Sequence, residues 1–188
     1  MFPKFPIILF LLILFFMGCQ VDSKPKSDLE KEDVKMAIKL ISNAFDEGGI
    51  IPSEYTCDDI DVSPKLSWGA PPKGTKSWAL ICDDPDAPMG IWVHWVVYCI
   101  PPEVNLLPKG IDKEKIVLGG VKQGRNDFGK IGYGGPCPPP GKPHRYFFKL
   151  YALDFMPDWE AGMTKSQVMK GIEGHIIAEA ELMGKYGR

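Results

Sequence analysis

The run of residues 91–100 limits the possible folds of this chain more than any other segment. It reads Ile-Trp-Val-His-Trp-Val-Val-Tyr-Cys-Ile, is apolar on both alternating faces, and ends at two prolines. A strand with this pattern has to be covered on both sides. The 18 prolines and 20 glycines of the chain are too many for a helical bundle. We therefore predict a mostly β protein in which this segment is a central strand.

Other short runs are rich in β-forming residues and are bounded by Gly, Pro, Asp and Asn. Strands are predicted at residues 76–82 and 146–153, with weaker candidates at 38–40 and 176–182. One helix is predicted at 165–173, with Thr164 as its N-cap. The predicted architecture is an antiparallel β-sandwich with one or two peripheral helices and long loops rich in Pro and Gly.

The N-terminal segment has the features of an export signal. Residues 7–17 are entirely apolar, which suits a signal peptide and is too short for a membrane-spanning helix. Because Phe-Met-Gly-Cys at 16–19 resembles a bacterial lipobox, we predict a signal peptide at 1–18 and lipidation of Cys19. A plain secretory peptide and an uncleaved anchor are the alternatives. All three place the protein outside the cytoplasm. The preferred prediction is an exported protein of the cell envelope that is held at a membrane by the lipid on Cys19.

The rest of the chain divides into a spacer and one domain. Residues 19–33 are charged and nearly free of large apolar side chains, so we expect a flexible tether, or simply a frayed terminus. Residues 34–188 have the length of a single domain. The net charge of −2 provides no basic surface, so nucleic acid is not an expected partner.

Four cysteines remain after Cys19. Cys82 and Cys99 lie in apolar runs and are predicted to be buried, whereas Cys57 and Cys137 lie in turn-like segments, and the sequence leaves a disulfide between them open. No Cys-x-x-Cys pair or His/Cys spacing indicates zinc, and we expect no metal or cofactor.

Four polar side chains form the candidate site: Asp84, His94, His144 and Tyr146. A carboxylate, two imidazoles and a phenol that meet in one cavity can hold a phosphate-like group through hydrogen bonds. The period of two predicts that His144 and Tyr146 share a strand face. It also places His94 among apolar neighbours such as Val96, where it needs a partner, and Asp84 is the candidate.

Several long motifs lie along the chain in order. They are Tyr-Thr-Cys-Asp at 55–58, Val-Ser-Pro-Lys-Leu-Ser-Trp at 62–68, Asp-Asp-Pro-Asp-Ala-Pro at 83–88, His-Trp-Val-Val-Tyr at 94–98, Gln-Gly-Arg-Asn-Asp-Phe-Gly at 123–129, Gly-Tyr-Gly-Gly-Pro-Cys-Pro-Pro at 132–139 and His-Arg-Tyr at 144–146. Through these motifs the predicted domain at 34–188 resembles the phosphatidylethanolamine-binding protein family, specifically its bacterial Raf-kinase-inhibitor-like branch.

The resemblance implies a β-sandwich with a small surface cavity that accepts phosphate, phosphoryl head groups and similar anions. Its motif positions imply that Asp84, His94, His144 and Tyr146 are cavity residues. They also imply a set of wall residues, which are Ala87, Pro88, Gly135 and Pro138. A kinase partner is not implied, because the kinase-inhibiting members are not exported.

Three kinds of function stay open. The preferred one is a non-catalytic protein that binds a small anionic ligand. The second is a hydrolase in which His94 or His144 activates water with the help of Asp84. No serine lies in a nucleophile-elbow context and no cysteine lies beside a histidine, which disfavours catalysis. The third is an inhibitor or adaptor that acts on an unknown protein partner through its surface.

Overall fold

The computed structural model describes residues 38–188, which form two antiparallel sheets and one α-helix. The predicted signal peptide, Cys19 and the spacer lie outside these residues. The small sheet has the order β1-β2-β5, and its strands are β1 (Leu40–Ser42), β2 (Leu66–Trp68) and β5 (Leu106–Leu107). The large sheet has the order β6-β7-β4-β3-β8-β9, as follows: β6 (Ile116–Val117), β7 (Val121–Gln123), β4 (Trp92–Ile100), β3 (Ser77–Asp84), β8 (His144–Leu153) and β9 (Ile176–Tyr186).

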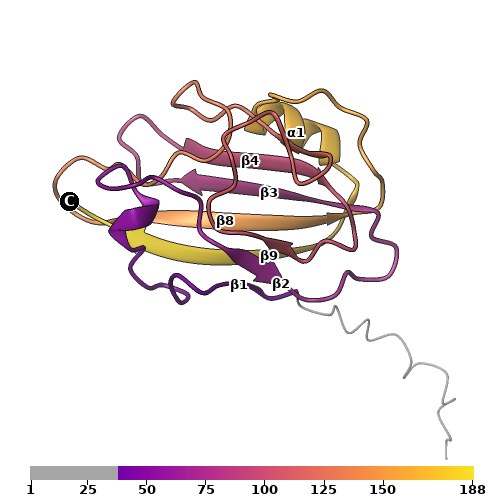
Figure 1. The fold of residues 1–188 in the computed structure, drawn as a ribbon, viewed down its shortest axis with the longest axis horizontal. Helices are drawn as coiled ribbons and strands as arrows, with labels where there is room; N and C mark the ends of the chain where they lie inside the picture. The colour runs from indigo at the N-terminus through magenta and orange to yellow at the C-terminus, as the bar shows by residue number, and fades with distance from the viewer. Residues whose placement is uncertain (1–37) are drawn as a thin grey trace, which may run out of the picture. The chain divides into compact units, whose positions relative to one another are not determined.

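The four long strands run side by side in the large sheet (Figure 1). β3 lies between β4 and β8, and all of its residues are buried. The segment at 91–100, predicted as a central strand, is β4, which pairs with β3 and β7. The prediction of an antiparallel β-sandwich is confirmed.

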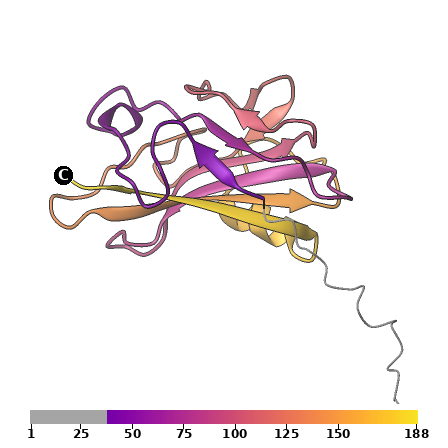
Figure 2. The ribbon, with the colours of Figure 1, turned by 90° about the horizontal axis from the view of Figure 1, so that it is seen from below.

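The large sheet is covered on both faces. The larger core lies between the two sheets and contains Leu40, Leu66, Trp78 and Phe148. The second core lies under the helix α1 (Lys165–Ile172), whose Val168 and Ile172 are fully buried. Figure 2 shows the small sheet on one side of the large sheet and α1 on the other. This double cover explains why β3 and β4 are apolar on both faces.

The helix begins where the sequence predicts. Thr164 is its N-cap: the Thr164 hydroxyl accepts a hydrogen bond from the Gln167 amide, and the Gln167 side chain accepts one from the Thr164 amide. This capping box satisfies two amides that the first turn leaves without partners. Ser53–Tyr55 adds a single 3-10 turn.

Two bulges in β4 change the faces that strict alternation predicts. Asp83 pairs with Val93 and Cys82 pairs with Trp95, so His94 has no opposite residue on β3. After this bulge, Val96 packs under the helix while Trp95 packs between the sheets, and the prediction that His94 and Val96 share a face is wrong. The extra residue shifts the period by one position.

Smaller differences occur at the sheet edges. The strand predicted at 38–40 begins at Leu40, because pairing with β2 holds Leu40–Ser42. The short strands β2, β5, β6 and β7 were not predicted. They have two or three residues each, and long-range pairing forms them rather than local pattern.

Candidate functional site: a cavity at one end of the large sheet

His144 and Asp84 form a buried pair at the end of the large sheet where β3 ends and β8 begins. His144 Nδ1 lies 2.7 Å from Asp84 Oδ2, and because a carboxylate accepts, the imidazole donates here. Asp84 Oδ1 accepts a second hydrogen bond, of 2.8 Å, from the Asp86 amide. Both Asp84 oxygens therefore have a protein donor, and the role of this carboxylate is to orient His144.

His94 has a different partner from the one that the sequence predicts. Its Nδ1 lies 2.7 Å from the Gly134 carbonyl, and the Gly134 amide donates in return to the His94 carbonyl at 2.9 Å. Asp84 instead binds His144, because the bulge turns His94 toward the loop that contains Gly134. Burial lowers the pKa of His94. The hydrogen bond to the Gly134 carbonyl raises this pKa, but by less than burial lowers it. The neutral ring keeps Nε2 free to accept or, once protonated, to donate.

Two buried donors in the same region have no partner among residues 38–188. They are the hydroxyl of Tyr146 and the indole Nε1 of Trp92. The Tyr146 ring stands edge-on to the His94 ring, with 5.1 Å between the centroids. Burial raises the pKa of Tyr146, and the nearby Asp84 carboxylate adds to this effect, so the phenol stays a donor. A buried donor without an acceptor costs about 1–3 kcal/mol, which a ligand oxygen would offset.

These side chains surround a cavity of about 190 Å³. Seven of the eight residues predicted for the site line it: Asp84, Ala87, Pro88, His94, Pro138, His144 and Tyr146. Of the four polar ones, His144 is the most exposed, at 9%. We therefore expect His144 to be the first of them to meet a ligand.

Gly135 is the predicted residue that the structure places elsewhere. It lines a neighbouring cavity and packs against the 55–61 loop. A Cβ on Gly135 would lie 2.3 Å from the Tyr55 carbonyl oxygen and 2.7 Å from Asp61 Oδ1. Close packing between two loops, rather than contact with a ligand in the first cavity, explains a glycine at this position.

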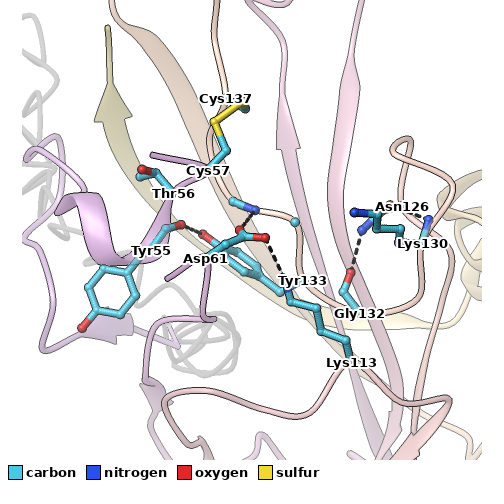
Figure 3. A network of polar contacts seen from close by, with 12 residues as sticks. Tyr55, Thr56, Cys57, Asp61, Lys113, Asn126, Lys130, Gly132, Tyr133 and Cys137 are labelled. Atoms are coloured by element: carbon cyan, nitrogen blue, oxygen red, sulfur yellow. Dashed lines mark hydrogen bonds and ion pairs between the residues drawn. A yellow bond between two sulfur atoms is a disulfide. The ribbon is translucent and has the colours of Figure 1, made fainter. Parts of the chain in front are cut away.

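The sequence left the cysteine pairing open, and the structure answers it. Cys57 and Cys137 form a disulfide, while Cys82 and Cys99 are buried and free, as predicted. The disulfide ties the 55–61 loop to the proline-rich loop that forms the cavity wall (Figure 3). The Cys57 amide also donates to the Pro136 carbonyl at 3.1 Å.

The set of residues predicted for the site leaves out several residues of the wall, namely Met89, Trp92, Phe128, Cys137 and Pro139. Trp92 had a usable signal, because it stands two positions before His94 on the same strand. Phe128 had none, because it lies 34 positions from His94 in the chain. Asp127 holds it in place by pairing with the backbone of Val93 at 2.7 and 2.9 Å.

An ion pair secures the cavity edge. Arg145 binds Asp86 through two side-chain hydrogen bonds of 2.7 and 2.8 Å and through its amide at 3.0 Å. These contacts lower the pKa of Asp86 to about 2. Asp86 therefore links β8 to the loop after β3.

Within residues 38–188, no three His, Cys, Asp or Glu side chains lie close enough together to hold a metal ion. No helix in the described part of the chain has the length and apolar character needed to cross a bilayer.

A family model described as phosphatidylethanolamine-binding protein matches residues 41–187, which is most of the chain. The chain belongs to the phosphatidylethanolamine-binding protein family. The resemblance inferred from the motifs is therefore confirmed.

Two relatives match this chain over most of their own length. A UPF0098 protein of Methanothermobacter thermautotrophicus is 50% identical over 151 residues, covering 80% of this chain and 99% of the relative. A UPF0098 protein of Pyrococcus horikoshii is 41% identical over 186 residues, covering 97% of this chain and 88% of the relative.

Solved structures of the phosphatidylethanolamine-binding protein family share the fold. A homologue from Chlamydia trachomatis is 43% identical, with a TM-score of 0.74 over 81% of this chain and 98% of that one. The YbcL protein of E. coli is 36% identical, with a TM-score of 0.75 over 80% of this chain and 98% of that one. Membership of the family supports a binding role for this chain.

Proposed function

We propose that this protein is a non-catalytic binding protein whose cavity holds a small anionic group, such as phosphate or a phosphoryl head group. One observation carries the proposal: two buried donors, the Tyr146 hydroxyl and the Trp92 indole, belong to cavity side chains and have no acceptor in the described part of the chain. Phosphoryl oxygens are strong acceptors and would satisfy them. His144, held by Asp84, adds a third group that can donate once it is protonated.

The cavity has features that suit binding more than chemistry. Its walls contain no serine or threonine, and its one cysteine, Cys137, is in a disulfide. The prolines Pro88, Pro138 and Pro139 fix their φ angles in advance, which lowers the entropy lost when a ligand is held. This arrangement presents hydrogen-bond donors from a stiff wall, and the residues that line it include no serine, threonine or free cysteine as a nucleophile.

The decisive variant is Tyr146→Phe, which removes the hydroxyl and keeps the ring. Calorimetric titration with phosphate and with phosphoethanolamine should show affinity reduced by about 3- to 10-fold, the value of one hydrogen bond. Stability should not fall, since the hydroxyl has no hydrogen-bond partner among the residues that the structure describes.

Tyr98→Phe is the matched control. The Tyr98 hydroxyl donates to the Glu160 carbonyl at 2.6 Å and lies in the core under the helix, so this variant should lose stability and keep its phosphate affinity. Unchanged binding in Tyr146→Phe, His94→Ala and His144→Ala together would exclude this cavity as the anion site.

A hydrolase is the second candidate, and the Asp84–His144 pair favours it. The imidazole donates Nδ1–H to the carboxylate, which leaves Nε2 as a base that could activate water. Steady turnover of p-nitrophenyl phosphate or p-nitrophenyl acetate that disappears in Asp84→Ala would establish the enzyme and overturn our preference.

We also propose that the protein is exported and held at a membrane by a lipid on Cys19. The apolar run at 7–17 and the lipobox-like Phe-Met-Gly-Cys support this proposal. Mass spectrometry of the mature protein tests it: an unmodified Cys19 at or near the N-terminus would contradict lipidation, and an intact residue 1 would contradict cleavage.

A further inference from the structure

A second cavity adjoins the first. It has a volume of about 200 Å³, and its lining includes Asp61, Lys113, Asn126 and Lys130 (Figure 3). Phe128 and Cys137 line both cavities.

The wall between the two cavities is thin. The Phe128 ring stands edge-on to Trp92 and His94, with centroid distances of 5.5 and 5.4 Å. On its other side the ring lies against Gly134, where a Cβ would come within 2.7 Å of it. The peptide that binds His94 therefore borders the second cavity as well. One aromatic ring, one peptide and the disulfide separate the two spaces.

The charges differ between the cavities. In the first, the Asp84 carboxylate is bound to His144, and burial lowers the pKa of His94. In the second, Lys113 binds Asp61 at 2.7 Å, while the ammonium of Lys130 has no hydrogen bond or ion pair in the described part of the chain. Two ammonium groups against one carboxylate leave one net positive charge. The second cavity therefore offers an anion the ammonium of Lys130, which has no partner within residues 38–188.

We infer that the two cavities form one bipartite site for a small phosphoryl compound that carries a second acidic group, such as a carboxylate, on a short linker. The phosphoryl group lies among the donors of the first cavity, and the second acid lies near Lys130. This inference rests on the function proposed above and adds the chemical class of the ligand. A second anionic group would gain the attraction of a cationic surface that a lone phosphate does not reach.

Substitution of Asp61 tests the effect of charge in the second cavity. Its Oδ1 accepts a hydrogen bond of 2.6 Å from the Gly135 amide, and its backbone has φ of 60°. Asparagine tolerates this left-handed conformation and keeps a carbonyl oxygen for Gly135. Asp61→Asn thus removes a negative charge and the ion pair with Lys113, but it keeps the contact with Gly135. Lys130→Gln changes the charge in the opposite direction, and its ammonium has no partner to lose within residues 38–188.

The probes are ω-phosphonocarboxylates from 3-phosphonopropionate to 6-phosphonohexanoate, each compared with its carboxamide, and methylphosphonate as the reference. For at least one linker length we expect the carboxylate to bind the full chain about two- to five-fold more tightly than the amide. Lys130→Gln should abolish this difference, and Asp61→Asn should increase it. High salt should reduce it, because both charges are near solvent.

Lys76→Gln is the matched control, since Lys76 is an exposed lysine just before the opposite end of β3. It should leave every affinity unchanged. Carboxylates that bind no better than amides at every linker length, while methylphosphonate still binds, would overturn the bipartite site and leave the proposed function standing. A methylphosphonate that does not bind at all would refute the first cavity as an anion site, and this inference with it.

Discussion

Asp84 and His144 lie 60 positions apart in the chain, yet Oδ2 of one lies 2.7 Å from Nδ1 of the other. The pair closes the end of the large sheet, because Asp84 is the last residue of β3 and His144 is the first of β8. Each side chain is largely buried, and the second carboxylate oxygen holds the Asp86 amide. The polar base of the cavity is thus also part of the structure that keeps the sheet end together.

Replacement of Asp84 should therefore lower stability as well as affect the site. Asp84→Ala removes the acceptor for both His144 and the Asp86 amide, and we expect the free energy of unfolding to fall by about 2–4 kcal/mol. Urea unfolding at pH 7 measures this loss. Asp59→Ala is the control: Asp59 is exposed and its carboxylate has no recorded partner in residues 38–188, so its stability should stay within about 0.5 kcal/mol of wild type.

Anion affinity should increase as the pH falls. Burial lowers the pKa of His94 in the free protein, and a bound anion favours the protonated ring, so proton uptake is coupled to binding. Sulfate is a suitable probe because its charge does not change between about pH 5 and 8. Calorimetry should show affinity that still rises below the ordinary histidine pKa of about 6.5, and His94→Gln should flatten the curve. A sulfate affinity that is constant across this range in wild type would contradict a histidine contribution.

Reduction of the disulfide should destabilise the domain. Cys57 and Cys137 are 80 positions apart, so their bond removes much of the conformational freedom of the unfolded chain. The paired Cys57→Ser and Cys137→Ser variant should lose about 2–4 kcal/mol of unfolding free energy. Its phosphate affinity should fall too, because Cys137 is part of the cavity wall. Cys82→Ser and Cys99→Ser are the controls, because both cysteines are buried and form no disulfide. If the disulfide is the cause, wild type under reducing conditions should have the stability of the paired variant and not that of either control.

Gly135→Ala tests the packing of the two loops. The added methyl group would lie 2.3 Å from the Tyr55 carbonyl oxygen, and the backbone of the 55–61 loop would have to move. We expect a loss of about 1–3 kcal/mol in unfolding free energy. Gly69→Ala is the matched control, because a Cβ there meets no atom within 4 Å. Equal stabilities of the two variants would show that the loops do not need this close approach.

Local pattern was sufficient for much of the fold. The alternation in β8 correctly placed His144 and Tyr146 on one strand face, and both line the cavity. The apolar run in β4 correctly predicted a strand covered on both sides, and Thr164 correctly marked the start of α1. These features depend on side-chain period and on capping, which act over a few residues.

The site was predicted only in part, for a physical reason. The sequence offered Asp84, His94, His144 and Tyr146 as neighbours, and all four line one cavity. The hydrogen-bond partners of these side chains could not be predicted from the sequence. The bulge at His94 shifts the alternation of the strand by one residue, and pairing with β3 determines where this bulge lies.

What the sequence determined by itself is the β-rich architecture and the residue types at the site, since both follow from local preference and chemistry. The tertiary structure alone decided that His94 binds Gly134 while Asp84 binds His144, and that Phe128 divides two cavities. It also decided that Cys57 pairs with Cys137. Each of these contacts joins segments 34 to 80 positions apart, and packing of the whole domain, rather than any local rule, fixes which of them meet.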